Sequence, residues 1–140
     1  MFEAEKDKYL MKHGFGATRL KAVLFDMDGV LFDSMPNHAY SWSHAMTQFG
    51  LHITPEEAYM HEGRTGGGTI DLLAQRDWGR RATEEEKQTI YKAKSDVFSR
   101  CPEAPRMPGA YELLKKVKAD GFTPMVVTGS GQVSLIDRLN

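Results

Sequence analysis

Residues 22–29, AVLFDMDG, decide the fold. A short apolar run that is closed by acidic residues and a glycine is typical of a strand buried on both faces of a sheet. Because side chains alternate along an extended chain, the carboxylates of Asp26 and Asp28 point the same way. Two negative charges at the end of a buried strand are costly, and a hard divalent cation such as Mg²⁺ would relieve their repulsion. The same pattern also suits a strand-ending turn with two solvated acids.

A second buried strand is predicted for residues 122–127, and the tight loop Thr128-Gly129-Ser130-Gly131 follows it. Between the two strands, apolar residues recur every three or four positions, which predicts four successive helices over residues 36–100. A further helix, with its apolar stripe from Ala110 to Val117, leads into the second strand. Strands that are separated by helices imply parallel pairing, so the sequence predicts an α/β fold.

Local signals place the boundaries of the four helices. Ser34 is predicted to cap the first one, with a proline in its first turn. Thr54 and Thr83 each precede glutamates in a pattern typical of a capping box, so they are predicted to begin the second and fourth helices. Gly66-Gly67-Gly68 is predicted to be a flexible loop ahead of the third.

The chain is predicted to form two units. A proline-rich stretch, residues 102–108, breaks the chain after the four helices. We therefore predict a partial α/β core made of residues 1–34 and 102–140, and an inserted helical cap made of residues 35–101. Such an insert would lie over the carboxyl ends of the strands, where open α/β sheets place their binding sites.

The composition excludes several classes of protein. The 140 residues contain 18 lysines and arginines against 19 aspartates and glutamates, so a net charge of −1 offers no electrostatic footprint for nucleic acid or an anionic membrane. No apolar run approaches the ~20 residues of a membrane span, and the charged N-terminus lacks the apolar core of a signal peptide. A single cysteine, Cys101, fits a reducing compartment. We therefore expect a cytoplasmic protein without nucleic-acid or membrane partners.

Two motifs carry a resemblance to a known family. Residues 23–31, VLFDMDGVL, resemble the first motif of the haloacid dehalogenase-like (HAD) superfamily, and residues 126–130, VVTGS, resemble its second. The sequence is most similar to the β-phosphoglucomutase-like group, because His38 and Trp42 fall where that group has a histidine and a tryptophan. Arg106-Met107-Pro108-Gly109 resembles the group's return to the core. The resemblance implies a Rossmann-like parallel-sheet HAD core, incomplete here, with an inserted four-helix cap.

The resemblance also implies phosphoryl transfer on a small sugar phosphate. Asp26 matches the nucleophile that becomes an aspartyl phosphate, and Asp28 matches the general acid/base that also gives its backbone carbonyl to Mg²⁺. We therefore expect both aspartates to be catalytic and metal-binding, with Mg²⁺ as the cofactor. Thr128 matches the hydroxyl that holds the transferring phosphate, and the backbone N–H groups around Gly129 and Ser130 would also suit an anion. Taken alone, Thr128 is more typical of a helix N-cap.

Two residues of the predicted cap are further site candidates. The resemblance implies that His38 contacts the substrate or assists the acid/base, and the alternative is an exposed helix histidine. Residues 62–69 resemble the substrate-specificity loop of the cap, where Arg64 could clamp a second phosphate. Gly66, however, stands near the position at which β-phosphoglucomutases carry their cap arginine, and the glycines could serve only as a hinge.

The sequence departs from the superfamily's pattern after the second motif. The third motif supplies a lysine and the fourth supplies acidic Mg²⁺ ligands, whereas the residues after Thr128 contain no lysine and a single acid, Asp137. The chain therefore resembles an N-terminal portion, with an incomplete sheet through which it could self-associate. Two functions stay open: a phosphatase or phosphomutase, and a truncated, catalytically silent piece that at most binds a partner. A dehalogenase is disfavoured, because such enzymes lack the second aspartate, here Asp28.

Overall fold

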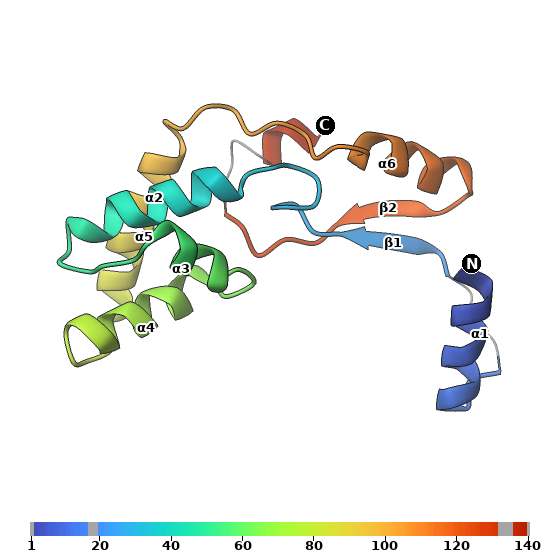
Figure 1. The fold of residues 1–140 in the computed structure, drawn as a ribbon, viewed down its shortest axis with the longest axis horizontal. Helices are drawn as coiled ribbons and strands as arrows, with labels where there is room; N and C mark the ends of the chain where they lie inside the picture. The colour runs from blue at the N-terminus through green and yellow to red at the C-terminus, as the bar shows by residue number, and fades with distance from the viewer. Residues whose placement is uncertain (1, 17–19, 132–135, 140) are drawn as a thin grey trace.

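The structure is a computed structural model that describes residues 2–16, 20–131 and 136–139. Figure 1 shows a two-stranded sheet, a group of helices beyond one end of it, and an N-terminal helix beyond the other. The elements in chain order are α1 (Phe2–His13), β1 (Ala22–Phe25), α2 (Met35–Thr47), α3 (Pro55–Met60), α4 (Gly66–Asp77), α5 (Glu84–Phe98), α6 (Ala110–Ala119), β2 (Thr123–Val126) and the 3₁₀ helix η1 (Asp137–Leu139). Within the described ranges, every helix is too short or too polar to cross a membrane.

The two strands pair in parallel, which confirms the predicted α/β topology. Ala22 lies opposite Thr123 and Phe25 lies opposite Val126. The ladder continues past the strands, because the N–H of Val127 donates to the carbonyl of Phe25 at 2.8 Å. Parallel strands cannot be joined by a tight turn, and here the chain returns to the sheet through α6, which packs against β2.

The strands are less buried than predicted. Phe25 is buried and Val23 is partly buried in a cluster that includes Val117 of α6. Leu24 alternates to the other face and is 63% exposed, and Met125 of β2 is 49% exposed. The prediction of strands buried on both faces is therefore wrong for the described residues. The reason is that α6 covers one face, and no other described element makes an extended contact with the sheet.

The four helices α2 to α5 pack around a hydrophobic cluster of their own. Helix α2 packs against α3 and α5, and α4 packs against α5. The buried cluster includes Ala39, Ala45, Met46, Leu51, Ile70, Leu73 and Ile90. Phe98, at the end of α5, belongs instead to the cluster between β1 and α6, so it links the helical group to the sheet. The division into a core of residues 1–34 and 102–140 and a cap of residues 35–101 stays a prediction.

Most helix starts follow the predicted local capping. Thr83 and Glu86 form the predicted capping box at α5. Thr54 begins α3, and its hydroxyl oxygen accepts from the N–H of Glu57 at 3.1 Å. Ser34 does precede α2, but it makes no side-chain capping bond. The reason lies in the candidate site described below, where the Ser34 hydroxyl has another acceptor.

The glycine run 66–68 is the first turn of α4, so the prediction of a flexible loop is wrong. Thr65 stands at the N-cap of this helix, and its hydroxyl oxygen accepts from the N–H of Gly68 at 3.2 Å. Such a cap contributes about 1 kcal/mol, which is comparable with the cost of one glycine in a helix. The cap and the packing of α4 against α5 therefore outweigh the low helix propensity of the run.

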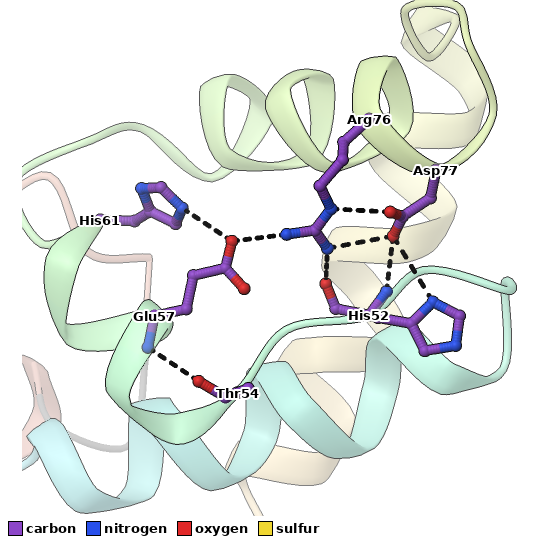
Figure 2. A network of polar contacts seen from close by, with 6 residues as sticks. All are labelled: His52, Thr54, Glu57, His61, Arg76 and Asp77. Carbon is purple, nitrogen blue, oxygen red and sulfur yellow. Dashed lines mark hydrogen bonds and ion pairs between the residues drawn. The ribbon is translucent and has the colours of Figure 1, made fainter.

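A polar network ties the end of α4 to α3 and to the segment before it (Figure 2). Arg76 donates to Glu57 at 2.6 Å and to Asp77 at 2.7 Å, and it also donates to the carbonyl of His52. Asp77 accepts in turn from the N–H of His52 at 2.8 Å. The bond from Arg76, together with that from His52, lowers the pKa of Asp77 to about 2, against the effect of burial. The network therefore stabilises the helical group while Asp77 is ionised.

We expect replacement of Asp77 to cost stability in a pH-dependent way. A depressed carboxyl pKa contributes stability that is fully present above the unfolded-state value near 4, and this contribution is lost as the pH falls through the folded-state value of about 2. Asp77→Asn should lower the free energy of unfolding by roughly 1 to 2 kcal/mol at pH 7, a range that allows for solvent screening. The difference from the unmodified protein should shrink to less than half of its pH 7 value at pH 2.5, and it should vanish only as the pH falls below 2. Urea denaturation across this pH range measures both values.

The matched control is Asp96→Asn, which removes an exposed ion pair with Lys92 on α5. Such pairs contribute little, so this variant should stay within about 0.5 kcal/mol of the unmodified protein at either pH. If Asp77→Asn lost the same free energy at pH 2.5 as at pH 7, the contribution would come from packing and not from charge.

Candidate active site

A cavity of about 390 Å³ lies where the ends of β1 and β2 face the helical group. Its lining brings together all seven residues that the sequence analysis predicted as site residues: Asp26, Asp28, His38, Arg64, Thr128, Gly129 and Ser130. The strand pairing accounts for this meeting, because the carboxyl ends of parallel strands lie at the same edge of a sheet. The roles of these residues stay predictions, and the contacts below define what each could do.

The two aspartates of the first motif have different surroundings. Asp26 is exposed, and its Oδ1 accepts from the N–H of Met27 at 2.7 Å. Asp28 is partly buried, and its Oδ1 accepts from the hydroxyl of Ser34 and faces Nε2 of His38 at 3.0 Å. This contact explains why Ser34 does not cap α2. Asp26 is the more accessible carboxylate, and Asp28 is the more firmly held one.

The contacts of Asp28 set its charge. Burial by itself raises the pKa of this carboxyl, but the hydrogen bonds from His38 and Ser34 favour the ionised form. The net result is a pKa below the ordinary value of an aspartate. Asp28 is therefore a carboxylate at neutral pH, able to accept a proton.

His38 lies between Asp28 and a lysine of α5. Its Nε2 faces Asp28, and its Nδ1 lies 2.8 Å from Nζ of Lys94. An ionised carboxylate only accepts hydrogen bonds and a lysine amine next to an imidazole donates, so the neutral tautomer with the proton on Nε2 satisfies both partners. The alternative of an exposed helix histidine is excluded by these contacts. His38 instead connects the end of β1 to α5.

Lys94 is a cavity residue with reactive chemistry that the sequence analysis missed. Lys94 stands four residues after Ile90 and three before Val97, on the apolar face of its helix, where a lysine is out of place, and this spacing is the signal in the sequence that could have found it. The side chain is only 1% exposed, and its Nζ lies 4.8 Å from the ring centre of Phe98 and 5.5 Å from that of Trp42. Burial lowers the pKa of Lys94 to about 8, although the negative charge of Asp28 acts in the opposite direction.

The loop after β2 is ordered by its own threonine. Oγ1 of Thr128 accepts from the N–H of Ser130 at 3.0 Å. The hydroxyl proton of Thr128 is then available to an acceptor in the cavity. The N–H of Ser130 is directed to Thr128 in this turn, and the expected role of Gly129 and Ser130 in binding an anion stays a prediction.

The first turn of α4 makes room for two cavity residues. A Cβ atom on Gly66 would lie 2.3 Å from the ring of Tyr91, and one on Gly68 would lie 3.2 Å from the side chain of Arg64. Both Tyr91 and Arg64 line the cavity. The glycines therefore have a packing role, and the interpretation of the run as a hinge finds no support in a helical turn.

The donor set of the cavity fits magnesium in part. Within the described ranges, no cluster of three or more His, Cys, Asp or Glu side chains could hold a metal ion. Asp26 and Asp28 nevertheless offer carboxylate oxygens beside one cavity. Mg²⁺ commonly takes one or two carboxylates together with water and phosphate oxygens. These two residues are therefore compatible with an ion that substrate and water help to coordinate.

Comparison with known proteins gives concordant results. The family described as haloacid dehalogenase-like hydrolase matches residues 20–139. A phosphoglycolate phosphatase of Haemophilus influenzae is 30% identical over 119 residues, which cover 79% of this chain and 52% of that protein.

Solved structures give results that agree with these two matches. A protein of Bacteroides vulgatus, provisionally named a β-phosphoglucomutase, matches with a TM-score of 0.87 and 60% sequence identity. This match covers 96% of the present chain and 54% of the Bacteroides vulgatus chain. A β-phosphoglucomutase of Clostridium difficile shares the fold with a TM-score of 0.72 at 20% identity, covering 87% of this chain and 57% of its own.

These matches have two consequences. The chain spans about half the length of the relatives that it matches. The family match, in contrast, extends over most of the chain and includes both motifs and the helical group between them. The chain therefore belongs to the haloacid dehalogenase-like hydrolase family.

Proposed function

We propose that this chain carries the nucleophile and the phosphate-binding residues of a Mg²⁺-dependent phosphoryl-transfer site for a small sugar phosphate. One observation carries the proposal: Asp26, Asp28 and Thr128, which match the two motifs, line one cavity with residues of the helical group. The relatives named as phosphoglycolate phosphatase and β-phosphoglucomutase support phosphoryl transfer as the reaction class. Sugar phosphatase and phosphomutase activities are both candidates.

Asp26 is the proposed nucleophile. One of its carboxylate oxygens is held by the N–H of Met27. The other is free to form the bond to phosphorus while the P–O bond of the ester breaks, which produces an aspartyl phosphate. Thr128 is proposed to donate its hydroxyl proton to a phosphoryl oxygen, and Arg64, which also lines the cavity, to bind a second anionic group.

Asp28 is proposed to exchange a proton with the reacting oxygen. Because Ser34 and His38 hold it in the ionised form, Asp28 accepts a proton more readily than it donates one in the arrangement described. It can serve as an acid for the leaving group only after these bonds loosen. We therefore assign Ser34 and His38 as positioning residues for Asp28.

Magnesium is the proposed cofactor. Asp26 would bind it through its carboxylate, and Asp28 through its backbone carbonyl. The bound ion supplies positive charge that offsets the charge of the phosphoryl group. A cytoplasmic location is proposed as well, and it is supported by the single cysteine, Cys101, which is a free thiol.

A second copy of this chain is the proposed macromolecular partner. The open face of the sheet presents Leu24 at 63% exposure beside Met125, and exposed apolar strands recruit other chains. We expect the 140-residue chain to form oligomers at micromolar concentration, and Leu24→Lys to shift it toward a monomer. Light scattering measures both masses, with Val30→Lys, which replaces an exposed apolar residue outside the strands, as the control. A monomeric unmodified chain would contradict self-association.

Asp26→Asn tests the proposed nucleophile. The amide keeps the shape of the side chain but cannot attack phosphorus, so turnover of a phosphate ester with Mg²⁺ should fall by roughly 10³-fold or more, as in other enzymes that lose a nucleophile. The measurement uses the intact protein that contains this chain. The matched control is Asp33→Asn, which changes an exposed aspartate outside the cavity and should retain activity.

Two results would contradict the proposal in different ways. Undiminished turnover in Asp26→Asn would exclude Asp26 as the nucleophile. Background turnover in the unmodified protein, across several sugar phosphates, would instead favour the alternative of a catalytically silent chain that binds a partner.

Gly66→Ala tests how the cavity wall is built. The added Cβ would meet the Tyr91 ring at 2.3 Å, so the ring must move, at a cost of about 1 to 3 kcal/mol in the free energy of unfolding. Gly67→Ala is the matched control, because its Cβ would meet only the Lys87 side chain at 3.7 Å. Thermal denaturation should show a loss of stability for Gly66→Ala and none for Gly67→Ala. In a chain that already carries Tyr91→Ala, adding Gly66→Ala should cause no further loss of stability. Equal stability of the two alanine variants would contradict the contact.

A further inference from the structure

The amine of Lys94 is a nucleophile that the proposed reaction does not use. Its side chain is only 1% exposed, yet Lys94 lines the cavity that Asp26 and Thr128 also line. A molecule that reaches this amine therefore has to enter the cavity, and bulk solvent does not reach it freely. A lysine in this position differs from the other lysines of α5, of which Lys92 is 75% exposed at the side chain.

The contacts of the amine favour attack on an electrophile. Nζ donates toward Nδ1 of His38 at 2.8 Å, and that nitrogen is the acceptor in the tautomer fixed by Asp28. Donation uses a proton of the amine and leaves the lone pair of the neutral form available. Three rings, those of Trp42, Tyr91 and Phe98, lie within 5.9 Å of Nζ. The rings of Trp42 and Tyr91 line the cavity and would also pack against a flat or apolar ligand.

The protonation state points in the same direction. Burial lowers the pKa of Lys94 to about 8, whereas a lysine side chain in water titrates near 10.4. A substantial fraction of this amine is therefore neutral at pH 7.5 to 8. Neutral amines are the form that reacts with carbonyl groups.

We propose that Lys94 is a reversible covalent site for phosphorylated aldehydes, including the open-chain form of aldose phosphates. The phosphate group would occupy the end of the cavity at Asp26 and Thr128, and the aldehyde carbon would reach Nζ at the other end. One imidazole ring, that of His38, separates Asp28 from the amine of Lys94. A ligand with a few atoms between its phosphate and its aldehyde group therefore spans the distance from the aspartates to this amine. The phosphate end of this proposal rests on the proposed function.

The reaction balances without a further reactant. The lone pair of Nζ forms a bond to the carbonyl carbon, and the carbonyl oxygen takes up a proton to give a carbinolamine. Loss of that oxygen as water, together with the second amine proton, leaves a C=N double bond between the ligand and Lys94. Addition of water reverses the reaction. An aldehyde phosphate would in this way occupy the cavity and block it until it is hydrolysed.

Pyridoxal 5′-phosphate is a suitable probe, because it carries an aldehyde and a phosphate. The protein is incubated with it between pH 6.5 and 9, the C=N bond is reduced with borohydride, and the labelled lysines are identified by peptide mass spectrometry. At pH 7.5 we expect Lys94 to be labelled at least ~10-fold faster than Lys92, because of its larger neutral fraction. The rate at Lys94 should reach half of its maximum near pH 8. Inorganic phosphate should slow labelling of Lys94 and leave Lys92 unaffected.

Two variants and one comparison complete the test. Lys94→Arg should remove the fast label and Lys92→Arg should leave it unchanged, with circular dichroism to verify that each variant folds. Labelling of Lys94 no faster than that of Lys92 in the unmodified protein would overturn the covalent site itself. Equal labelling of Lys94 by pyridoxal, which has no phosphate, would overturn the requirement for a phosphorylated ligand. That second result would count against the phosphate end of the proposed function and leave the reactivity of Lys94 established.

Discussion

The main-chain ladder between β1 and β2 is the interaction on which the candidate site depends. Because both strands run in the same direction, the pairing of Phe25 with Val126 brings the acidic turn after β1 beside the loop that begins at Thr128. Each of these two segments supplies only part of the lining of the cavity. Separate main-chain bonds join the two ends of the helical insert: the N–H of Asp33 donates to the carbonyl of Pro105, and the N–H of Met107 donates to the carbonyl of Leu31. The helices therefore lie beyond one end of the sheet (Figure 1). Backbone pairing thus determines which side chains become neighbours.

A chain of three side chains extends this arrangement into the helices. Asp28 belongs to the turn after β1, His38 to α2 and Lys94 to α5, and each is bonded to the next. The order of acceptor, neutral imidazole and amine satisfies the polar groups in a partly buried region, where an unpaired group would be costly. The same contacts keep Asp28 ionised and keep the amine of Lys94 at the cavity wall. The bonds that keep Asp28 ionised therefore also connect α2 to α5, beside the hydrophobic cluster that packs these helices.

The errors of the sequence-based predictions have local physical causes. Leu24 was predicted to be buried because apolar runs usually are, but burial depends on which element covers each face, and α6 covers only one. Gly66 to Gly68 were predicted to be a loop from the propensity of glycine, but a cap from Thr65 and the need to fit Tyr91 and Arg64 outweigh propensity. Ser34 was predicted to cap α2, and a carboxylate brought close by the fold takes its hydroxyl instead.

The sequence by itself determined the local features: the two strands, the order of the helices, the capping box at Thr83, and seven of the residues that line the cavity. Periodicity, capping patterns and motif spacing are properties of neighbouring residues, so they can be read from the chain. Tertiary structure alone decided the partner of Lys94, the acceptor of Ser34 and the space required at Gly66. Lys94 meets His38 because α2 packs against α5, and Gly66 meets Tyr91 because α4 packs against α5. Ser34 reaches Asp28 through the shape of the turn after β1, which local capping patterns do not specify.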